Sequence, residues 1–354
     1  MRARPRGNKV FYYLDTGGKP RKEIPLGSDY TAAVQQWADL TSRPSPVVTV
    51  HTFDSVAQEY WKTVIPTKSP QTQADNEKER AWLNKFFNDP PAPLDEIKPV
   101  HIRSYLDWRV KTTREAAIQK NKERASEKKP PLPIKDGRVR ANREKALFSH
   151  IWNFAREYGY TDKPNPCLGV KGFEEVGRDV YVDDALIQSV KDKASEPLRF
   201  ALDLAHLTGQ RPGDVLRMSE TDLNAGMLHV RQGKTKAKLR IMVEGELARL
   251  IEAMTQYKAS VTKSDKVRQL SLLVNERGEK YTSAMLRNDF DAARNLAGIE
   301  KGLFQFRDLR AKAATDADDT EGIRKAQALL GHTTEGMTAD YVRHKLGKKV
   351  RPLK

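Results

Sequence analysis

At residues 304–314 the chain reads Phe304-Gln305-Phe306-Arg307-Asp308-Leu309-Arg310-Ala311-Lys312-Ala313-Ala314, and this stretch decides its fold. It predicts the opening of a helix on which Arg307 and Arg310, three residues apart, share one face. Further along, Ala328-Leu329-Leu330-Gly331-His332 predicts a helix that ends at its glycine, because glycine readily adopts the left-handed conformation found at helix C-termini. We expect a short helix holding Tyr341 to follow it.

Two earlier segments carry further charged side chains. An apolar helix is predicted to end at Gly209, and Pro212 suits the first turn of the next helix, so Arg211 lies in a rigid elbow with Asp214 one turn away. A hairpin is predicted from Met227–Arg231 and Leu239–Val243, whose connecting turn carries three lysines, namely Lys234, Lys236 and Lys238. Its Gly233-Lys234-Thr235 resembles the end of a nucleotide-binding loop. Leu228 stands where that motif needs glycine, so ATP binding is not supported.

Upstream, the pattern predicts a small hairpin, Val10–Leu14 with Lys22–Leu26, and a helix from Tyr30 to about Leu40. Residues 41–46 have the composition of a linker. Residues 52–159 are predicted to be helical, with a loop at Pro130–Pro133, and residues 172–354 to form a mixed α/β domain. Four stripes of residues recur at helical spacing, and each predicts an amphipathic helix. The stripes are Phe53, Val56, Tyr60 and Trp61; Ala81, Trp82, Lys85 and Phe86; Ile102, Tyr105, Leu106 and Arg109; and Ala146, Leu147, His150, Ile151 and Phe154.

The composition narrows the class of partner. The chain has 63 Lys and Arg against 47 Asp and Glu, a formal net charge of +16, which favours a polyanionic partner. Cys167 is the only cysteine, which excludes an intramolecular disulfide and argues against a cysteine-built metal site. We find no apolar run near the ~20 residues of a membrane helix and no secretory signal, and therefore expect a cytosolic chain without metal.

The basic excess is concentrated between Lys111 and Lys145, where twelve basic residues face five acidic ones. A solvated linker has this composition, and so does a surface that follows nucleic-acid phosphates, where each neutralised phosphate releases counterions. The stretch alone favours neither interpretation. In the second case the DNA-binding residues would include Lys111, Lys120, Lys122, Arg138, Arg140 and Arg143.

Each motif taken singly has an ordinary structural explanation: a surface arginine, an exposed lysine turn, a histidine after a helix cap, a core tyrosine. Their order, Arg211, Lys234, Arg307-Asp308-Leu309-Arg310, Leu329-Leu330-Gly331-His332 and then Tyr341, resembles that of the tyrosine recombinases, the phage-type integrases. The resemblance covers the whole chain and is sharpest over residues 180–345. Phage members typically also share features like Ala141–Phe148 and Asn165-Pro166-Cys167.

The resemblance implies a multidomain α+β fold with three parts. Residues 1–44 would form a hairpin-and-helix module that binds arm-site DNA, and 45–168 an all-α domain that binds core-site DNA. Residues 169–354 would form a mainly α catalytic domain with a small antiparallel sheet.

The resemblance also implies a role for each site residue. Tyr341 would be the nucleophile, Arg211 and Arg310 would bind the phosphate oxygens, and His332 would hydrogen-bond the scissile phosphate. Lys234 would be the general acid, with Lys236 as the alternative, and Asp214 would support Arg211. Arg307 stands where the family usually has histidine; arginine can donate to phosphate but cannot accept a proton near neutral pH.

A chain of this kind would be a site-specific DNA recombinase. It would cleave and rejoin DNA through a 3′-phosphotyrosine, integrating or excising a phage or another mobile element without cofactor or metal. Its partners would be double-stranded DNA at attachment sites and three further copies of itself, with DNA-bending and directionality factors as candidates, in the bacterial cytoplasm and away from membranes. The alternative is a sequence-specific DNA-binding regulator of the same fold with impaired catalysis, which the substitution at Arg307 favours.

Overall fold

A computed structural model describes residues 1–42, 50–262 and 269–343. The chain divides into two units, Met1–Val176 and Gly177–Lys354. The linker predicted at 41–46 lies largely outside the described residues, and the proposed division into three domains stays a prediction. In the described part of the chain, no helix is long and apolar enough to cross a membrane.

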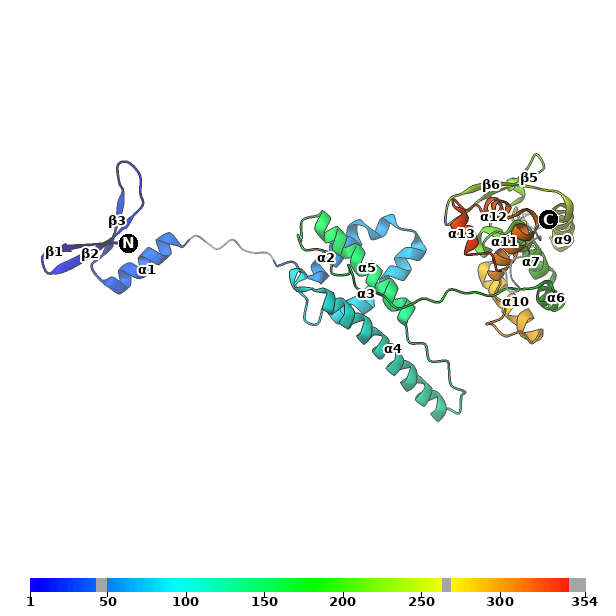
Figure 1. The fold of residues 1–354 in the computed structure, drawn as a ribbon, viewed down its shortest axis with the longest axis horizontal. Helices are drawn as coiled ribbons and strands as arrows, with labels where there is room; N and C mark the ends of the chain where they lie inside the picture. The colour runs from blue at the N-terminus through cyan, green and yellow to red at the C-terminus, as the bar shows by residue number, and fades with distance from the viewer. Residues whose placement is uncertain (43–49, 263–268, 344–354) are drawn as a thin grey trace, which may run out of the picture. The chain divides into compact units, whose positions relative to one another are not determined.

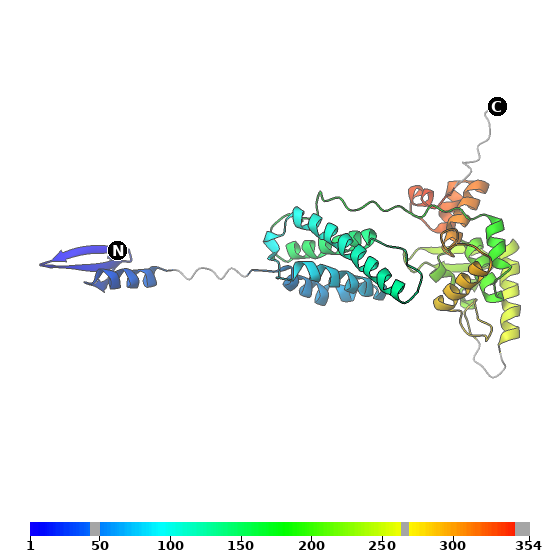
Figure 2. The same cartoon turned by 90° about the horizontal axis from the view of Figure 1, so that it is seen from below.

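The N-terminal module is a three-stranded antiparallel sheet with one helix. Its strands lie in the order β1 (Arg2–Arg6), β2 (Lys9–Asp15), β3 (Glu23–Gly27). The helix α1 (Tyr30–Thr41) begins at Asp29, whose carboxylate accepts the Ala32 N–H, and it packs against β2 and β3 (Figure 2). The sequence predicted only two strands. It missed β1 because Arg-Ala-Arg-Pro-Arg has no apolar alternation and is exposed throughout.

The rest of the first unit is a helical bundle. It comprises two short 3₁₀ turns and four helices: α2 (Phe53–Thr63), η1 (Ile65–Thr67), α3 (Pro70–Phe87), η2 (Leu94–Glu96), α4 (Pro99–Ser126) and α5 (Arg138–Glu157). The stripe predicted on α4 is confirmed, since all four of its residues are buried. The stripe on α3 is confirmed only in part: Trp82 and Phe86 are partly buried, but Ala81 and Lys85 are exposed. Leu83 and Phe87 are the buried residues instead, and Phe87 packs on the rings of Phe53 and Phe148.

A buried ion pair joins α4 to α5. The Nε of Arg109 lies 2.8 Å from the Oε2 of Glu144, which also accepts the Tyr105 hydroxyl at 2.6 Å. The guanidinium of Arg109 stacks over the Trp82 ring at 3.6 Å. Burial next to the Glu144 carboxylate raises the pKa of Tyr105 far above its ordinary value, so its hydroxyl stays a donor.

The basic stretch between Lys111 and Lys145 is folded. All buried residues of the 28-residue helix α4 lie at or before Arg109, so its second half projects from the bundle (Figure 1). Its sequence is rich in Ala, Glu, Lys and Arg, which favour helix without tertiary packing. The return loop, where Pro130–Pro133 is irregular as predicted, is tied back by paired hydrogen bonds of 2.8 Å between Asn121 and Leu132. We call residues 111–137 the α4 arm; it is mostly exposed, as a solvated stretch would be, but it is helical up to Ser126 and thus not an irregular linker throughout.

The second unit is a mainly helical domain with a small antiparallel sheet, as predicted. Its elements are α6 (Asp184–Lys191), α7 (Glu196–Thr208), α8 (Pro212–Val215), η3 (Glu220–Asp222), β4 (Leu223–Asn224), β5 (Met227–Arg231), β6 (Lys238–Met242), α9 (Gly245–Val261), α10 (Ser283–Leu296), α11 (Asp308–Glu321), α12 (Ile323–Leu330) and α13 (Glu335–Ala339). The strands follow the order β4-β5-β6. Helix α7 packs against α6, α8, α9, α10 and α11 and buries Leu198, Ala201 and Leu204 completely, so its C-terminal end is rigidly held.

The Arg109–Glu144 pair gives a direct test of the helical bundle. Replacing Glu144 by alanine leaves Arg109 buried without its carboxylate and should lower the free energy of unfolding by about 3–5 kcal/mol. Urea unfolding followed by tryptophan fluorescence measures this, because all five tryptophans lie in the first unit. The control Glu59→Ala removes an exposed pair with Lys62 and should change stability by about 1 kcal/mol at most. Equal losses in the two variants would contradict this packing.

Candidate active site

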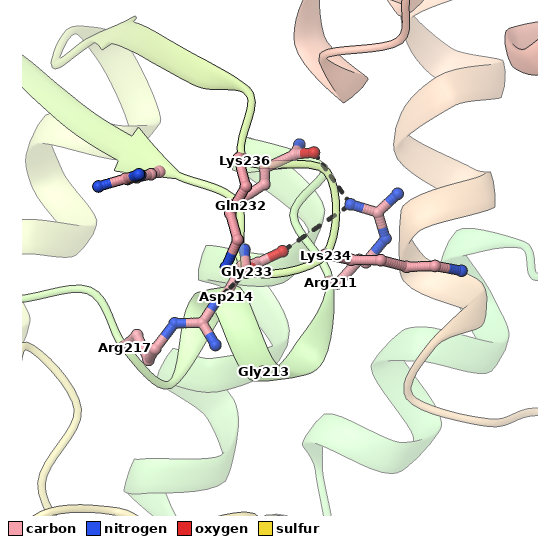
Figure 3. Close-up of a pocket in the computed structure, with 9 residues that line it drawn as sticks. Arg211, Gly213, Asp214, Arg217, Gln232, Gly233, Lys234 and Lys236 are labelled. Carbon is pink, nitrogen blue, oxygen red and sulfur yellow. Dashed lines mark hydrogen bonds and ion pairs between the residues drawn. The ribbon is translucent and has the colours of Figure 1, made fainter. Parts of the chain in front are cut away.

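Arg211 is held at the elbow that the sequence predicted. Helix α7 ends at Gly209, which has a φ of 64°, and Arg211 caps the N-terminus of the short helix α8. A side chain at 209 would also crowd Leu329 and Leu330, so glycine serves both the backbone and the packing here. The Nη1 of Arg211 donates to the Oε1 of Gln232 at 2.9 Å (Figure 3).

Asp214 joins this elbow to the β5–β6 hairpin. Its carboxylate is buried, accepts the backbone N–H of Gly233 at 2.8 Å and pairs with Arg217. Its second oxygen lies 3.9 Å from the Nη1 of Arg211, as Figure 3 shows. Asp214 therefore fixes the start of the lysine turn relative to Arg211.

A cationic cavity of about 650 Å³ opens at this point. Five basic side chains line it, with Asp214 as the single carboxylate; the lining residues are Arg211, Gly213, Asp214, Arg217, Arg231, Gln232, Gly233, Lys234 and Lys236. Both candidate lysines thus face the same cavity. Its excess of positive charge suits an anion such as a phosphodiester.

Gln232 is the residue that the sequence interpretation missed. Its fully buried amide accepts from Arg211 and from the Thr235 hydroxyl at 2.6 Å, and donates to the Gln210 amide oxygen and the Leu330 carbonyl, both at 2.8 Å. One side chain therefore links the elbow, the lysine turn and the end of α12. No periodicity marks it; the only sequence signal is an amide placed directly before Gly233-Lys234.

Arg310 is a buried cation on α11. Its guanidinium donates to the Gly209 carbonyl at 2.7 Å and the Leu330 carbonyl at 2.8 Å, and lies 3.0 Å from the Nε2 of His332. Its Nε has no partner within the described residues. Burial, reinforced by the charge of Arg211, lowers the pKa of Arg310 to about 10. The arginine stays charged at neutral pH, but its surroundings favour a bound anion.

His332 follows the glycine cap of α12 and contacts Arg310. Gly331 has a φ of 64°, and a side chain there would crowd Gln232 and Leu239. The Nδ1 of His332 lies 3.1 Å from the Thr338 hydroxyl, itself a donor to the Thr334 carbonyl. Burial, followed by the charges of Arg310 and Arg211, lowers the pKa of His332 to about 4. The imidazole is therefore neutral at pH 7, with Nε2 as acceptor and Nδ1 as donor.

Tyr341 lies beside these groups, but not inside a helix as predicted. Helix α13 ends at Ala339, and the Tyr341 N–H bonds the Thr338 carbonyl at 2.8 Å, a tight last turn that ends the α-helix early. The half-buried ring lies 5.1 Å from the His332 ring and 5.3 Å from the Arg310 guanidinium carbon, centre to centre. The structure thus brings Tyr341, Arg310 and His332 together.

Arg307 is placed differently from Arg310. It precedes α11, is exposed, and lines a second cavity of about 290 Å³ that has no lining residue in common with the first. Pro212, Arg287 and Lys301 are among its other lining residues. Because Arg307 is exposed and Arg310 is buried, the two arginines do not share one environment, although they are three residues apart.

The six expected DNA-binding residues are all exposed. Three lie on the projecting half of α4 and three in the first turns of α5. Arg138 pairs with Asp136 at 2.9 Å and Arg143 with Glu175 at 3.4 Å, both on the surface. These residues form a basic surface on the first unit, separate in sequence from the cavity above.

Comparison with known proteins finds several relatives, one of which is similar over nearly the whole chain. The phage integrase family model matches residues 182–347. The integrase of Escherichia phage HK022 is 33% identical over 364 residues, covering 95% of this chain and 91% of that protein. The integrase of Escherichia phage lambda is 29% identical over 175 residues, 47% of this chain and 48% of that protein.

Solved structures share the fold. A lambda integrase dimer bound to a COC′ core site matches with a TM-score of 0.66 at 20% identity, covering 86% of this chain and 99% of that one. A lambda integrase tetramer bound to a Holliday junction has the same TM-score and identity and covers 99% of this chain and 97% of that one. With an HK022 relative similar over nearly its full length, the chain belongs to the phage integrase family of tyrosine recombinases.

Proposed function

We propose that this chain is a site-specific DNA recombinase that cleaves and rejoins DNA through a 3′-phosphotyrosine at Tyr341. The observation that carries the proposal is the buried Arg310 guanidinium, which has a second cation nearby, no carboxylate within ion-pair distance among the described residues, and the Tyr341 ring 5.3 Å away. A DNA phosphate would supply the missing negative charge. The tyrosine would then lie beside the phosphorus that it attacks.

In the proposed reaction the Tyr341 oxygen bonds to phosphorus as the bond to the 5′-oxygen breaks. The phenol proton passes to solvent water, and the leaving 5′-oxygen takes a proton from Lys234, with Lys236 as the alternative from the same cavity. Arg211 and Arg310 neutralise the phosphate oxygens. His332 would donate to one of them in the tautomer that carries its proton on Nε2, with Nδ1 then accepting from the Thr338 hydroxyl. Asp214 and Gln232 keep Arg211 and the lysine turn in place. The reverse reaction with a new 5′-hydroxyl rejoins the strand.

The proposal extends to DNA binding and assembly. The α4 arm, residues 111–137, and the start of α5 would bind phosphates of the core site. The N-terminal sheet would bind DNA at the separate arm sites. Four copies of the chain would assemble on two duplexes. The lambda integrase structures, solved as a dimer on a core site and as a tetramer on a Holliday junction, support this by analogy. We expect the reaction to take place in the bacterial cytoplasm, with bending and directionality factors as candidate partners. The domains would be those outlined by the resemblance, 1–44, 45–168 and 169–354.

A DNA-binding regulator with impaired catalysis is the second candidate. Arg307 favours it, because a guanidinium in a separate cavity cannot take over proton transfer from a histidine. The two candidates differ in one measurable product, the covalent protein–DNA adduct.

The first prediction from this proposal concerns that adduct. On its attachment site, a nicked suicide duplex should trap the wild-type chain covalently, whereas Tyr341→Phe should bind the same DNA and form no adduct. Arg310→Gln should lower the cleavage rate by about 100-fold or more, because one preorganised donor to the developing charge is lost. Denaturing gel electrophoresis measures both. A wild-type chain that binds its site tightly but never forms an adduct would favour the regulator.

The second prediction concerns the basic surface on the first unit. The combined substitution Lys120→Ala, Lys122→Ala and Arg140→Ala should reduce the slope of log affinity against log salt by up to about 2.7, since each phosphate contact contributes about 0.9. Titrations at several salt concentrations measure the slope. As a control, Lys62→Ala and Lys78→Ala, exposed lysines of the same unit outside this surface, should leave the slope unchanged. An unaltered slope in the triple variant would exclude these contacts.

The third prediction concerns pH. Because the pKa of His332 falls from 6.5 to about 4 on folding, the unfolded chain binds this proton more readily. The stabilisation is complete above pH 6.5 and is lost as the pH falls towards 4. Scanning calorimetry should therefore show the second unit losing stability over that range more steeply in the wild type than in His332→Gln. Identical pH dependence in the two chains would contradict the neutral, buried imidazole.

A further inference from the structure

Arg178 and Arg343 lie outside the proposed phosphate site and link the segments that carry its residues. Arg178 is the second residue of the second unit and lies in an irregular segment that we call the entry segment, residues 177–183. Its guanidinium forms a two-point pair with Asp308, with Nε to Oδ1 at 2.7 Å and Nη2 to Oδ2 at 2.6 Å. Asp308 is the first residue of α11 and also accepts the Gln305 N–H at 2.7 Å. The entry segment is thereby bonded to the start of the helix that carries Arg310.

Arg343 also forms bonds to the entry segment. Its Nη2 donates to the Arg178 carbonyl at 3.1 Å, and its Nε lies 3.1 Å from the Asp179 carboxylate. Its backbone N–H donates to the Thr315 hydroxyl on α11 at 2.9 Å. Thr315 is almost fully buried and bonds the Ala311 carbonyl, so its position follows that of α11.

Arg343 stands two residues after Tyr341, on a segment whose Tyr341 and Val342 also pack on a small apolar cluster of α11 and α12. The preceding helix α13 has five residues, and Tyr341 lies in the turn beyond it. A misplacement of about 1 Å in a reacting group can slow a reaction about a hundredfold. The bonds of Arg343 to α11 and to the entry segment therefore bear directly on the distance between Tyr341 and Arg310.

We propose that Arg343 is a positioning residue for Tyr341, holding the segment after α13 against the entry segment and α11. Arg178 acts at the other end of the same contact, by fixing Asp308 and with it the start of α11. The role rests on the proposed cleavage reaction, but Arg343 itself does not touch the phosphate. Arginine suits this role because its forked guanidinium bonds both a carbonyl and a carboxylate, of which a lysine or an exchanged ion pair would keep only one.

The test compares cleavage and binding on a suicide duplex. Arg343→Ala should slow adduct formation at saturating DNA by about ten- to a hundredfold, while the Kd for the DNA stays near that of the wild type. Arg324→Ala is the matched control: it removes an exposed arginine paired with Glu335 at the start of α13, and should cleave at the wild-type rate. If Arg343→Ala unfolds more easily in a thermal scan, Arg343→Lys tests the same contact with the charge kept. It should still form the adduct more slowly than the wild type, and a wild-type rate would contradict the role.

Exchanging the charges of Arg343 and Asp179 distinguishes a positioning role of Arg343 from a direct contact with DNA. Arg343→Glu should cleave slowly, and adding Asp179→Lys should restore part of the rate, because the pair re-forms with opposite signs. The proposal is overturned if Arg343→Ala cleaves like the wild type, if its slow cleavage is fully explained by a raised Kd, or if the exchange restores nothing. Failure of the proposed function looks different, since the wild type and Arg324→Ala would then form no adduct either.

Discussion

The second unit is organised around one buried guanidinium. Arg310 has two backbone carbonyls as acceptors, one from the end of α7 and one from the end of α12, and His332 as a third neighbour. Carbonyl oxygens neutralise a cation only in part, and Arg211 adds a second positive charge. The carboxylate of Asp214 compensates these charges only in part, so the site keeps an excess of positive charge that favours a bound anion.

The glycines and amides around this site follow from that requirement. Gly209 and Gly331 end their helices in the left-handed conformation and leave room for Leu330 and Gln232. Gln232 then bridges Arg211, the lysine turn and the Leu330 carbonyl that Arg310 also uses. Groups that are far apart in the sequence are held rigidly before any substrate arrives, and such preorganisation lets charged donors stabilise a transition state.

The sequence predicted well what depends on local pattern and order. The elbow at Arg211, the hairpin around Lys234 and the cap before His332 follow from glycine, proline and strand alternation. It could not reveal Gln232, the Arg109–Glu144 pair or the bonds of Arg343, because each depends on which distant segments pack together. The strand Arg2–Arg6 lacked an apolar pattern, and the placement of Arg307 outside the first cavity depends on how α11 begins.

The central claim is that Tyr341, beside Arg310 and His332, forms the covalent bond to DNA. Mass spectrometry of the protease-digested adduct from a suicide duplex tests it most directly, because it identifies the modified residue itself. We expect the nucleotide on the peptide that contains Tyr341, attached through a 3′-phosphate. Attachment to any other tyrosine, serine or cysteine, or a 5′-phosphate linkage, would contradict the mechanism.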